Sequence, residues 1–330
     1  MDSRTLGSAG LTVSEQGLGC MGMSFGYTLG DEGEAVRTIH RALDAGVTLF
    51  DTADMYGPYT NERLLGSAVA DRRSEVVLAS KVGQEIDAQG QLTWKVNGTP
   101  DYVRKSIDGT LERLGVEQLD LYYLHRIDAS VPIEDTFGAM SEMVEQGKVR
   151  HLGLSEASAA TIRRAHAVHP VTAVQTEYSL LTRDVETNGV LEACRELGIG
   201  FVAYSPLCRG LLSGKVRGTD GLGELDFRRI APRFHEENIE HNLDVVDQIL
   251  KVAESKGVTA SQMALAWVLS RGQDCVALPG TKRTTYLDEN LTASQVSLSE
   301  SELAELDRIA PPGVAKGDRY PDFAMAELNI

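Results

Sequence analysis

The segment that decides the fold is Gly46-Val47-Thr48-Leu49-Phe50-Asp51-Thr52-Ala53-Asp54-Met55-Tyr56-Gly57. It joins a short apolar run, residues 47–50, to a polar turn that begins at Asp51 and contains Tyr56. An apolar run bounded by polar residues is typical of a strand buried on both faces of a parallel sheet. We therefore predict a parallel strand here, with two side chains that can handle protons at its carboxyl end.

Two later segments repeat this arrangement. Residues 76–80 form a second run that ends at Lys81, and residues 119–124 form a third that ends at His125. The carboxyl ends of neighbouring parallel strands meet at one rim, which is where barrel enzymes carry out their chemistry. The sequence thus predicts that all four polar side chains gather at the mouth of a barrel.

The spacing of the remaining elements indicates eight strand units. Counting begins at residues 17–19, and further strands are expected at residues 149–154, 171–175, 200–204 and 276–278. Most are separated by one helical pattern, such as residues 31–45 or the helix that Thr99 caps and Pro100 opens. This rhythm predicts an α/β fold, a single (β/α)8 TIM barrel in which residues 1–330 form one domain.

The chain ends and one long loop depart from this rhythm. We expect residues 4–13 to form a hairpin that plugs one barrel end, and residues 300–309 to form an extra C-terminal helix outside the barrel. Capping boxes are expected at two helix starts, Thr259 with Gln262 and Ser299 with Glu302. Residues 205–242 are rich in Gly and Arg and aperiodic, which is typical of a functional lid or a disordered segment. The tail beyond Pro311 shows no clear pattern.

Composition narrows the class of protein. The 330 residues are 42% hydrophobic and 24% charged, which fits a soluble enzyme with ample core material. A net charge of -16 argues against nucleic acid or an anionic membrane as a partner. Four scattered cysteines predict free thiols in a reducing compartment, and the N-terminus carries no apolar signal segment. We expect a cytoplasmic protein with no metal site; the oligomeric state is not predicted.

The four rim residues suit proton delivery to a carbonyl oxygen. Tyr56 is the expected general acid, because a neighbouring Lys81 can stabilise its phenolate. Asp51 can keep the lysine charged, and His125 can orient the carbonyl. Each residue also has a structural interpretation: a turn for Asp51 and Tyr56, a solvent-facing strand end for Lys81, and simple packing for His125. Their shared position at consecutive strand ends favours the catalytic interpretation.

These segments together resemble the aldo-keto reductase family. The other matching segments are Leu114-Gly115-Val116-Glu117-Gln118-Leu119-Asp120-Leu121-Tyr122-Tyr123-Leu124-His125, Gly153-Leu154-Ser155, Ala203-Tyr204-Ser205-Pro206-Leu207 and Pro279-Gly280-Thr281-Lys282-Arg283. The motifs follow the family order along nearly the whole chain. The phrase His125-Arg126-Ile127-Asp128 is similar to a perakine reductase-like branch of that family.

The resemblance implies a barrel that binds NADPH in extended form. Ser155 and Gln175 would then hold the nicotinamide carboxamide, and Tyr204 would stack on its ring. The remaining cofactor-binding residues implied by matched position are Met21, Ser205, Leu207, Arg209, Gly210, Gly280, Thr281, Lys282, Arg283, Glu289 and Asn290. Weaker candidates for the substrate pocket are Met23, Tyr27, Trp94 and Arg126.

Lys282 and Arg283 favour NADPH over NADH, because two adjacent cations suit the dianionic 2′-phosphate. An ordinary solvated helix start is the alternative. The chain departs from the family at two positions: Glu156 stands where many members have Asn, and Tyr286 stands where many have Arg.

The sequence therefore predicts an NADPH-dependent oxidoreductase that reduces an aldehyde or ketone to the alcohol, with the proton from Tyr56. Two alternatives stay open. One is a nicotinamide-binding regulatory subunit with incidental catalysis. The other is a barrel isomerase or lyase that binds a substrate phosphate at Lys282 and Arg283. The carbonyl substrate is a small molecule that the sequence does not specify.

Overall fold

Eight parallel strands form the centre of the computed structural model, which describes residues 1–28 and 30–329. They are β3 (Leu18–Gly19), β4 (Leu49–Asp51), β5 (Val77–Val82), β8 (Leu119–Leu124), β9 (Val149–Ser155), β10 (Val171–Glu177), β11 (Gly200–Tyr204) and β12 (Cys275–Leu278). Neighbours in this order pair with one another, and the bridges Gln16–Ala277 and Gly19–Gly280 join the last strand to the first. The predicted (β/α)8 barrel is confirmed.

Most strand residues are apolar because both faces of the strands are covered, although β9 carries the exposed Arg150. Inside the barrel, Leu49, Leu121 and Val202 pack together. Outside it, Leu78 and Tyr122 pack against the surrounding helices. All six residues of β8 are buried. This is why the strands appear in the sequence as continuous apolar runs rather than as alternating patterns.

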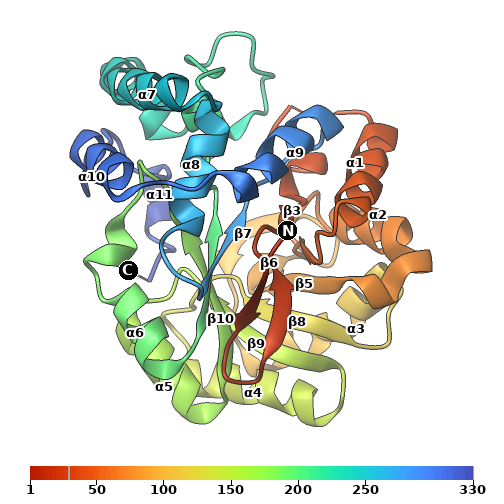
Figure 1. Ribbon diagram of the computed structural model, residues 1–330. Coiled ribbons are helices and arrows are strands. Elements are labelled where there is room, and N and C mark those ends of the chain that lie inside the picture. Colours follow the sequence, from red (N-terminus) through yellow and green to blue (C-terminus); the bar gives the residue numbers. More distant parts are fainter. Residues whose placement is uncertain (29, 330) are drawn as a thin grey trace.

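Helices surround the strands (Figure 1). They are α1 (Glu32–Asp44), α2 (Thr60–Val69), α3 (Pro100–Leu114), α4 (Ile133–Glu145), α5 (Ala159–Val168), α6 (Val190–Leu197), α8 (Ala260–Leu269) and α9 (Thr284–Leu291). Both predicted capping boxes are present, at the starts of α8 and α10 (Glu300–Ile309). As predicted, Thr99 is the N-cap residue of α3 and Pro100 opens the helix, but the Thr99 hydroxyl makes no capping hydrogen bond and donates to Asn97 Oδ1 instead, at 2.6 Å.

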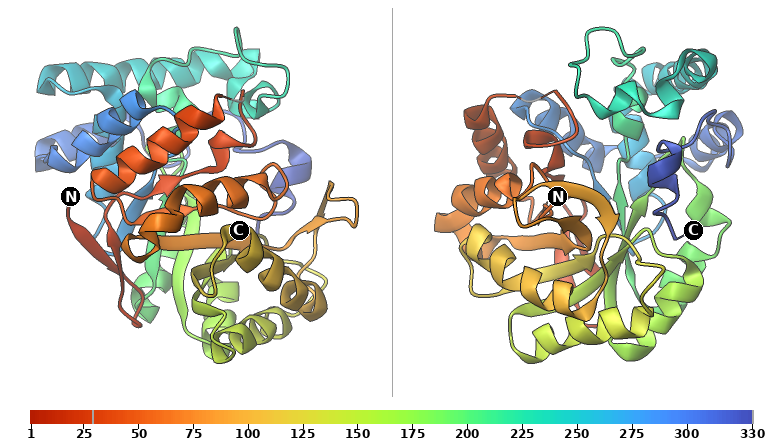
Figure 2. Two further views of the ribbon diagram at one scale, coloured as in Figure 1. Left: turned by 90° about the vertical axis from the view of Figure 1, so that its right-hand side faces the viewer. Right: turned by 180° about the vertical axis from the view of Figure 1, so that it is seen from behind.

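Two hairpins lie at opposite ends of the barrel (Figure 2, left). The predicted N-terminal hairpin consists of β1 (Ser3–Leu6) and β2 (Leu11–Ser14), which pair antiparallel. Leu6 lies directly on β11, where a Cβ on Gly200 would come within 2.3 Å of its side chain. The second hairpin, β6 (Gln84–Ile86) with β7 (Leu92–Val96), follows Lys81 and stands at the mouth.

Three further helices in the C-terminal half and short 3-10 helices along the chain complete the described structure. They are the helices α7 (Glu236–Lys256), α10 and α11 (Asp322–Met325), with short 3-10 helices at Met21–Met23, Ala70–Glu75, Asp184–Glu186, Cys208–Ser213, Phe227–Arg229, Pro232–Phe234 and Thr292–Gln295. As predicted, α10 lies outside the barrel, where it packs against α7. The tail after α10 then returns to the mouth, on the side of the second hairpin (Figure 2). No helix in the described part of the chain is long and apolar enough to span a membrane.

Candidate active site

The structure brings the four predicted catalytic residues together at the mouth. Asp51 ends β4, Lys81 lies near the end of the neighbouring β5, and His125 directly follows β8. Tyr56 lies in the turn that leaves β4. The Lys81 ammonium pairs with Asp51 Oδ1, donates to Thr52 O at 2.8 Å and lies 3.3 Å from the Tyr56 hydroxyl. All four side chains are buried.

Opposing effects set the charge states of Lys81 and Tyr56. Burial alone would lower the pKa of Lys81, but the negative charge of Asp51, together with Tyr56 and the hydrogen bonds to both, outweighs burial and the pKa is raised. Burial raises the pKa of Tyr56, and the Lys81 ammonium only partly reverses this. At neutral pH the lysine therefore carries its charge and the tyrosine carries its proton.

His125 completes the group as a neutral imidazole. Burial first, and then the positive charges of Arg126 and Lys81, hold its pKa well below the usual value. Its ring meets the Tyr56 ring edge-on, with centroids 5.8 Å apart. Its Nδ1 is buried without a hydrogen-bond partner among the described residues. A neutral ring beside a tyrosine hydroxyl can bind a carbonyl oxygen without competing for its proton.

The predicted cofactor residues follow the rim from β9 to the helix after β12. Ser155 ends β9, Gln175 lies near the end of β10, and Tyr204 ends β11. The Gln175 amide donates to Asp51 Oδ2 at 2.8 Å, so it connects this part of the rim to the catalytic group. Gly280, Thr281, Lys282 and Arg283 follow β12, and Glu289 and Asn290 lie on α9. Met21, on the other side, packs in an apolar cluster with Tyr56.

The loop after β11 has an unusual backbone. Ser205, Cys208, Arg209 and Gly210 all have positive φ angles, of 49°, 47°, 55° and 96°. Leu207, between them, has φ −99° and ψ 13°. Such alternation turns successive N–H groups toward one side, where they can bind an anion. Left-handed conformations at non-glycine residues are typical of functional sites. The loop therefore fits a phosphate group.

A second cationic group lies at the start of α9. Burial and the neighbouring Arg283 lower the pKa of Lys282. Lys282 donates to Thr28 O in the loop after β3. Arg283 and Lys215 lie over the ring of Tyr286, at 5.6 and 4.8 Å. Positive charges therefore gather here in excess, as an anion site requires.

Glu289 and Asn290 lie further along α9. Glu289 pairs with Lys215 of the long loop at 2.8 Å. Asn290 is buried. An adenine at this end of the rim would therefore meet a carboxylate that already has a partner.

Glu156, the first departure from the family, is bound by the C-terminal tail. Its two oxygens pair with the Arg319 guanidinium at 3.0 and 3.1 Å. Oε1 also accepts from the Tyr204 hydroxyl at 2.8 Å and from the Glu177 amide at 3.0 Å. Glu156 itself has a positive φ of 51°. This carboxylate therefore already has four donors, which leaves it little capacity to accept a carboxamide hydrogen bond as well.

Glu177 binds two further arginines nearby. Its Oε2 lies 3.4 Å from Arg209 and its Oε1 lies 3.2 Å from Arg233. Burial acts to raise the pKa of Glu177, but these arginines and Arg319 outweigh it and the pKa is lowered. The sequence pattern indicated Arg233 only as part of the long loop, and it did not indicate Glu177 or Arg319 as site residues. They are far apart in the sequence and follow no periodic pattern that could have pointed to them.

The long loop and the tail both cover the mouth. Asp226 accepts from the Thr28 amide at 3.2 Å, and the Phe227 amide donates to Gly26 O at 2.9 Å, so the loop is tied to the segment after β3. In the tail, the Tyr320 hydroxyl lies 2.8 Å from that of Tyr204. The 205–242 segment is thus an ordered cover, and the tail, which has no sequence pattern, is part of the site.

The weaker candidates for the substrate pocket differ in how deeply they are buried. Met23 is buried, and Tyr27 lies beneath Arg228 at 5.2 Å. Trp94, on β7, is 53% exposed and meets Phe323 of the tail edge-on at 6.2 Å. Arg126 is buried beside His125. Trp94 therefore lies at the outer edge of the mouth and Arg126 on its floor.

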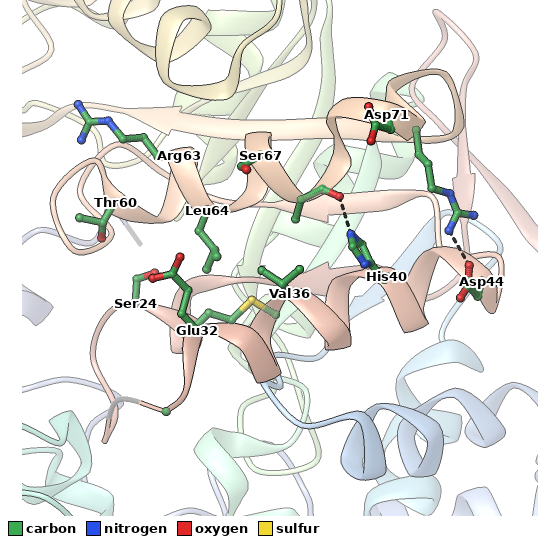
Figure 3. Close-up of a pocket in the computed structure, with 14 residues that line it drawn as sticks. Ser24, Glu32, Val36, His40, Asp44, Thr60, Arg63, Leu64, Ser67 and Asp71 are labelled. Atoms are coloured by element: carbon green, nitrogen blue, oxygen red, sulfur yellow. Dashed lines mark hydrogen bonds and ion pairs between the residues drawn. The ribbon is translucent and has the colours of Figure 1, made fainter.

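A cavity of about 800 Å³ lies away from this mouth, between α1 and α2 (Figure 3). It is an open surface groove, and its polar side chains largely satisfy one another: His40 contacts Ala68 O at 2.9 Å and Arg72 binds Asp44 at 2.5 Å. None of the four catalytic candidates lines it. Within the described residues, no cluster of His, Cys, Asp and Glu could hold a metal ion.

Comparisons with known proteins identify the family and support the fold. The sequence matches the model of the Aldo/keto reductase family over residues 16–311. The structure is similar to that of a glycerol dehydrogenase from Gluconobacter oxydans, with a TM-score of 0.85 and 29% identity over 94% of this chain and 97% of that one. It is also similar to a thermostable aldo-keto reductase solved with the inhibitor epalrestat, with a TM-score of 0.76 and 30% identity over 94% of this chain and 100% of that one.

Proposed function

Because the chain belongs to the aldo/keto reductase family, we propose that it reduces an aldehyde or ketone to the alcohol with NADPH and that Tyr56 delivers the proton. Members of this family act on carbonyl groups of small molecules with a nicotinamide cofactor. The observation that carries the proposal is the contact between the Tyr56 hydroxyl and the Lys81 ammonium, which itself pairs with Asp51.

Tyr56 is suited to act as the acid. In the resting state it holds its proton, since its pKa is raised by burial. As the carbonyl oxygen gains negative charge, the tyrosine proton moves to it, and the nearby Lys81 ammonium stabilises the phenolate that forms. Asp51 keeps that ammonium charged in a buried setting. After the reaction, the phenolate must regain a proton from solvent or from the lysine.

His125 orients the substrate in this proposal. A neutral imidazole can donate one hydrogen bond to the carbonyl oxygen from the ring nitrogen that faces the mouth. The Tyr56 hydroxyl can donate the second. Two donors fix the oxygen and leave the carbonyl carbon facing the rim beyond β9 and β10, where Ser155 and Gln175 lie.

The rim residues fit a nicotinamide dinucleotide. Bound NADPH supplies the hydride for the reaction. Tyr204 offers a ring near the mouth, the left-handed loop at 205–210 offers backbone donors for the pyrophosphate, and Lys282 with Arg283 offers cations for the 2′-phosphate. The excess of positive charge at the last site supports NADPH over NADH, since NADH has no group to balance it.

A substrate panel tests the proposal. We expect absorbance loss at the reduced-cofactor band with aromatic and aliphatic aldehydes, and a lower KM for NADPH than for NADH. Because one structural neighbour is a glycerol dehydrogenase, the panel includes glycerol with NADP⁺ in the oxidative direction. Cofactor binding without turnover of any carbonyl or alcohol would contradict the enzymatic proposal and favour the regulatory alternative.

A further inference from the structure

We propose that Arg126 makes this pocket selective for carbonyl substrates that carry a carboxylate group a few atoms from the reacting carbon. This proposal rests on the proposed function, because it names the substrate class of the same site. It goes further in assigning a charge to the substrate and a residue that recognises it.

Arg126 is a buried cation that directly follows the candidate catalytic histidine. It is only 9% exposed. One of its nitrogens, Nη1, donates to His125 O at 2.8 Å and lies 3.5 Å from Ser155 Oγ. The guanidinium therefore lies between the catalytic group and the end of β9. A substrate with its carbonyl oxygen at Tyr56 and His125 would extend past this side chain.

Arg126 has no carboxylate partner among the described residues. Within residues 1–28 and 30–329, no Asp or Glu oxygen pairs with it, and Nε and Nη2 donate no hydrogen bond. These two nitrogens are also not among the atoms that are sealed from solvent without a partner. They therefore keep some access to the mouth. A guanidinium buried to this extent is rarely left unpaired, because desolvating an uncompensated charge is costly.

The neighbouring charges do not supply the missing partner. Arg319 pairs with Glu156, while Arg209 and Arg233 both pair with Glu177. Four buried arginines at this side of the mouth therefore face two carboxylates. Arg209 lies in the left-handed loop that fits the cofactor pyrophosphate, which would provide a third anion. Arg126 is the cation left without one.

Position separates Arg126 from the cofactor phosphates. The phosphate candidates follow β11 and β12, whereas Arg126 follows β8 and contacts Ser155, at the nicotinamide end of the proposed path. The Tyr320 ring lies over Arg126 at 5.9 Å and offers a wall without charge. An anion that reaches Arg126 is therefore best supplied by the substrate itself.

The shape of the guanidinium defines the ligand. Nε and Nη2 lie on one edge of a planar fork, so they can bind both oxygens of a carboxylate in parallel. Consecutive residues place His125 and Arg126 close together, which limits the separation between the carbonyl and the carboxylate to a few atoms. Suitable compounds include semialdehydes of dicarboxylic acids and formyl-substituted aromatic acids.

A matched pair of substrates tests the charge requirement. 4-Carboxybenzaldehyde and methyl 4-formylbenzoate share a ring and a reacting aldehyde but differ in charge. In the wild-type enzyme with NADPH, we expect kcat/KM to be about tenfold to a hundredfold higher for the acid, the range for a hydrogen bond to a charged group. In Arg126→Gln this ratio should fall to near one, whatever happens to the two absolute rates. In Arg126→Lys, which keeps the charge but not the fork, an intermediate ratio is expected.

A surface arginine provides the control. Arg104 lies on α3 and pairs with Glu142 at an exposed site, so Arg104→Gln should keep the wild-type ratio. A binding measurement avoids any dependence on turnover, because NADP⁺ has no hydride to donate to an aldehyde: calorimetry of NADP⁺-loaded enzyme with 4-carboxybenzaldehyde should give a lower Kd than with methyl 4-formylbenzoate, and Arg126→Gln should remove the difference.

The outcomes separate the two proposals. Equal kcat/KM for acid and ester in the wild type, or an unchanged ratio in Arg126→Gln, would overturn the role of Arg126 and leave carbonyl reduction intact. If no carbonyl is turned over, the proposed function fails, and the calorimetric comparison still decides whether Arg126 binds a carboxylate. If Arg126→Gln does not fold, the wild-type ratio and Arg126→Lys decide the matter.

Discussion

The two sides of the barrel mouth stabilise their buried charges in different ways. On one side, Lys81 and Asp51 form a balanced pair whose members come from adjacent strands. On the other side, Glu156 and Glu177 bind arginines from the long loop and the tail, and positive charge is in excess. The first side is held by the barrel itself. The second depends on segments that lie over it.

In the proposed function, the proton donor belongs to the first side and the ligand-binding charges belong to the second. A proton donor must be held rigidly, and strand ends in a closed barrel cannot move apart without breaking the sheet. Ligand-binding charges, in contrast, can sit on covering segments that admit and release the ligand. The following substitutions test whether the two sides differ in this way.

Tyr56→Phe should have the largest effect. The ring and its packing remain, but the proton is lost, so we expect kcat for carbonyl reduction to fall by about 10²–10⁴-fold. Binding of NADPH, followed by fluorescence titration, should stay within a few-fold of wild type, because the hydroxyl lies on the proton-donating side. Reduction at the normal rate would remove Tyr56 from its assigned role.

Lys81→Met should destabilise the rigid side. It leaves the Asp51 carboxylate buried without its cation, which costs about 3–5 kcal/mol in the free energy of unfolding. Urea titration of the variant measures this. The double variant Lys81→Met/Asp51→Asn removes the orphaned charge and should recover part of the loss. A double variant no more stable than the single one would argue against the charge pair as the cause.

Arg319→Met should cost less, about 1.5–3 kcal/mol. Glu156 keeps its hydrogen bonds from Tyr204 and from the Glu177 amide, and the tail can move so that water reaches the carboxylate. Limited proteolysis should show earlier cleavage in the tail than in the wild type. Arg308→Met, on the exposed face of α10, is the control, and its tail should be cleaved no faster than that of the wild type.

Lowering the pH should reduce the free energy of unfolding through His125. Its pKa is lowered well below 6.5 in the folded state, so between that folded pKa and about 6.5 the unfolded chain binds the extra proton. Stability therefore falls as pH drops below about 6.5, by up to about 1.4 kcal/mol per pH unit. In His125→Gln this part of the slope should vanish, whereas replacement of the partly exposed His235 by Gln should leave it. Identical slopes for wild type and His125→Gln would show that another group controls it.

The smallest effect should come from a surface pair. Arg217 and Asp247 lie 2.5 Å apart, but both are about half exposed. Arg217→Ala should change the free energy of unfolding by less than about 1 kcal/mol. Chemical denaturation measures this, and a larger loss would mean that the long loop contributes more to stability than the contrast between the two sides implies.

Much of the barrel was predictable because local patterns encode it. Buried parallel strands require apolar runs, and the helices between them have one apolar face, so the eight units and both capping boxes could be recognised in the sequence. The N-cap position of Thr99 was predicted correctly, but its side chain hydrogen-bonds Asn97 rather than the helix, and only the folded turn decides between these two partners.

The residues at the strand ends were also predictable as a group. Asp51, Lys81 and His125 each follow or end an apolar run, so their meeting follows from strand direction alone. The tail was not predictable in this way. Arg319 and Tyr320 lie in a segment with no periodicity, and nothing in the sequence indicates that it contacts Glu156 and Tyr204.

Local sequence patterns therefore predict the barrel and the direction of its strands, because apolar runs and helical periodicity are short-range features. The four side chains at the barrel mouth follow from these patterns, because they lie at or just after the ends of the apolar runs. Chain packing, in contrast, places the tail over the mouth, pairs Glu156 with Arg319, and leaves Arg126 without a carboxylate among residues 1–28 and 30–329. The physical reason is that ion pairing among distant residues depends on how the whole chain packs. No local pattern records which buried charge lacks a partner.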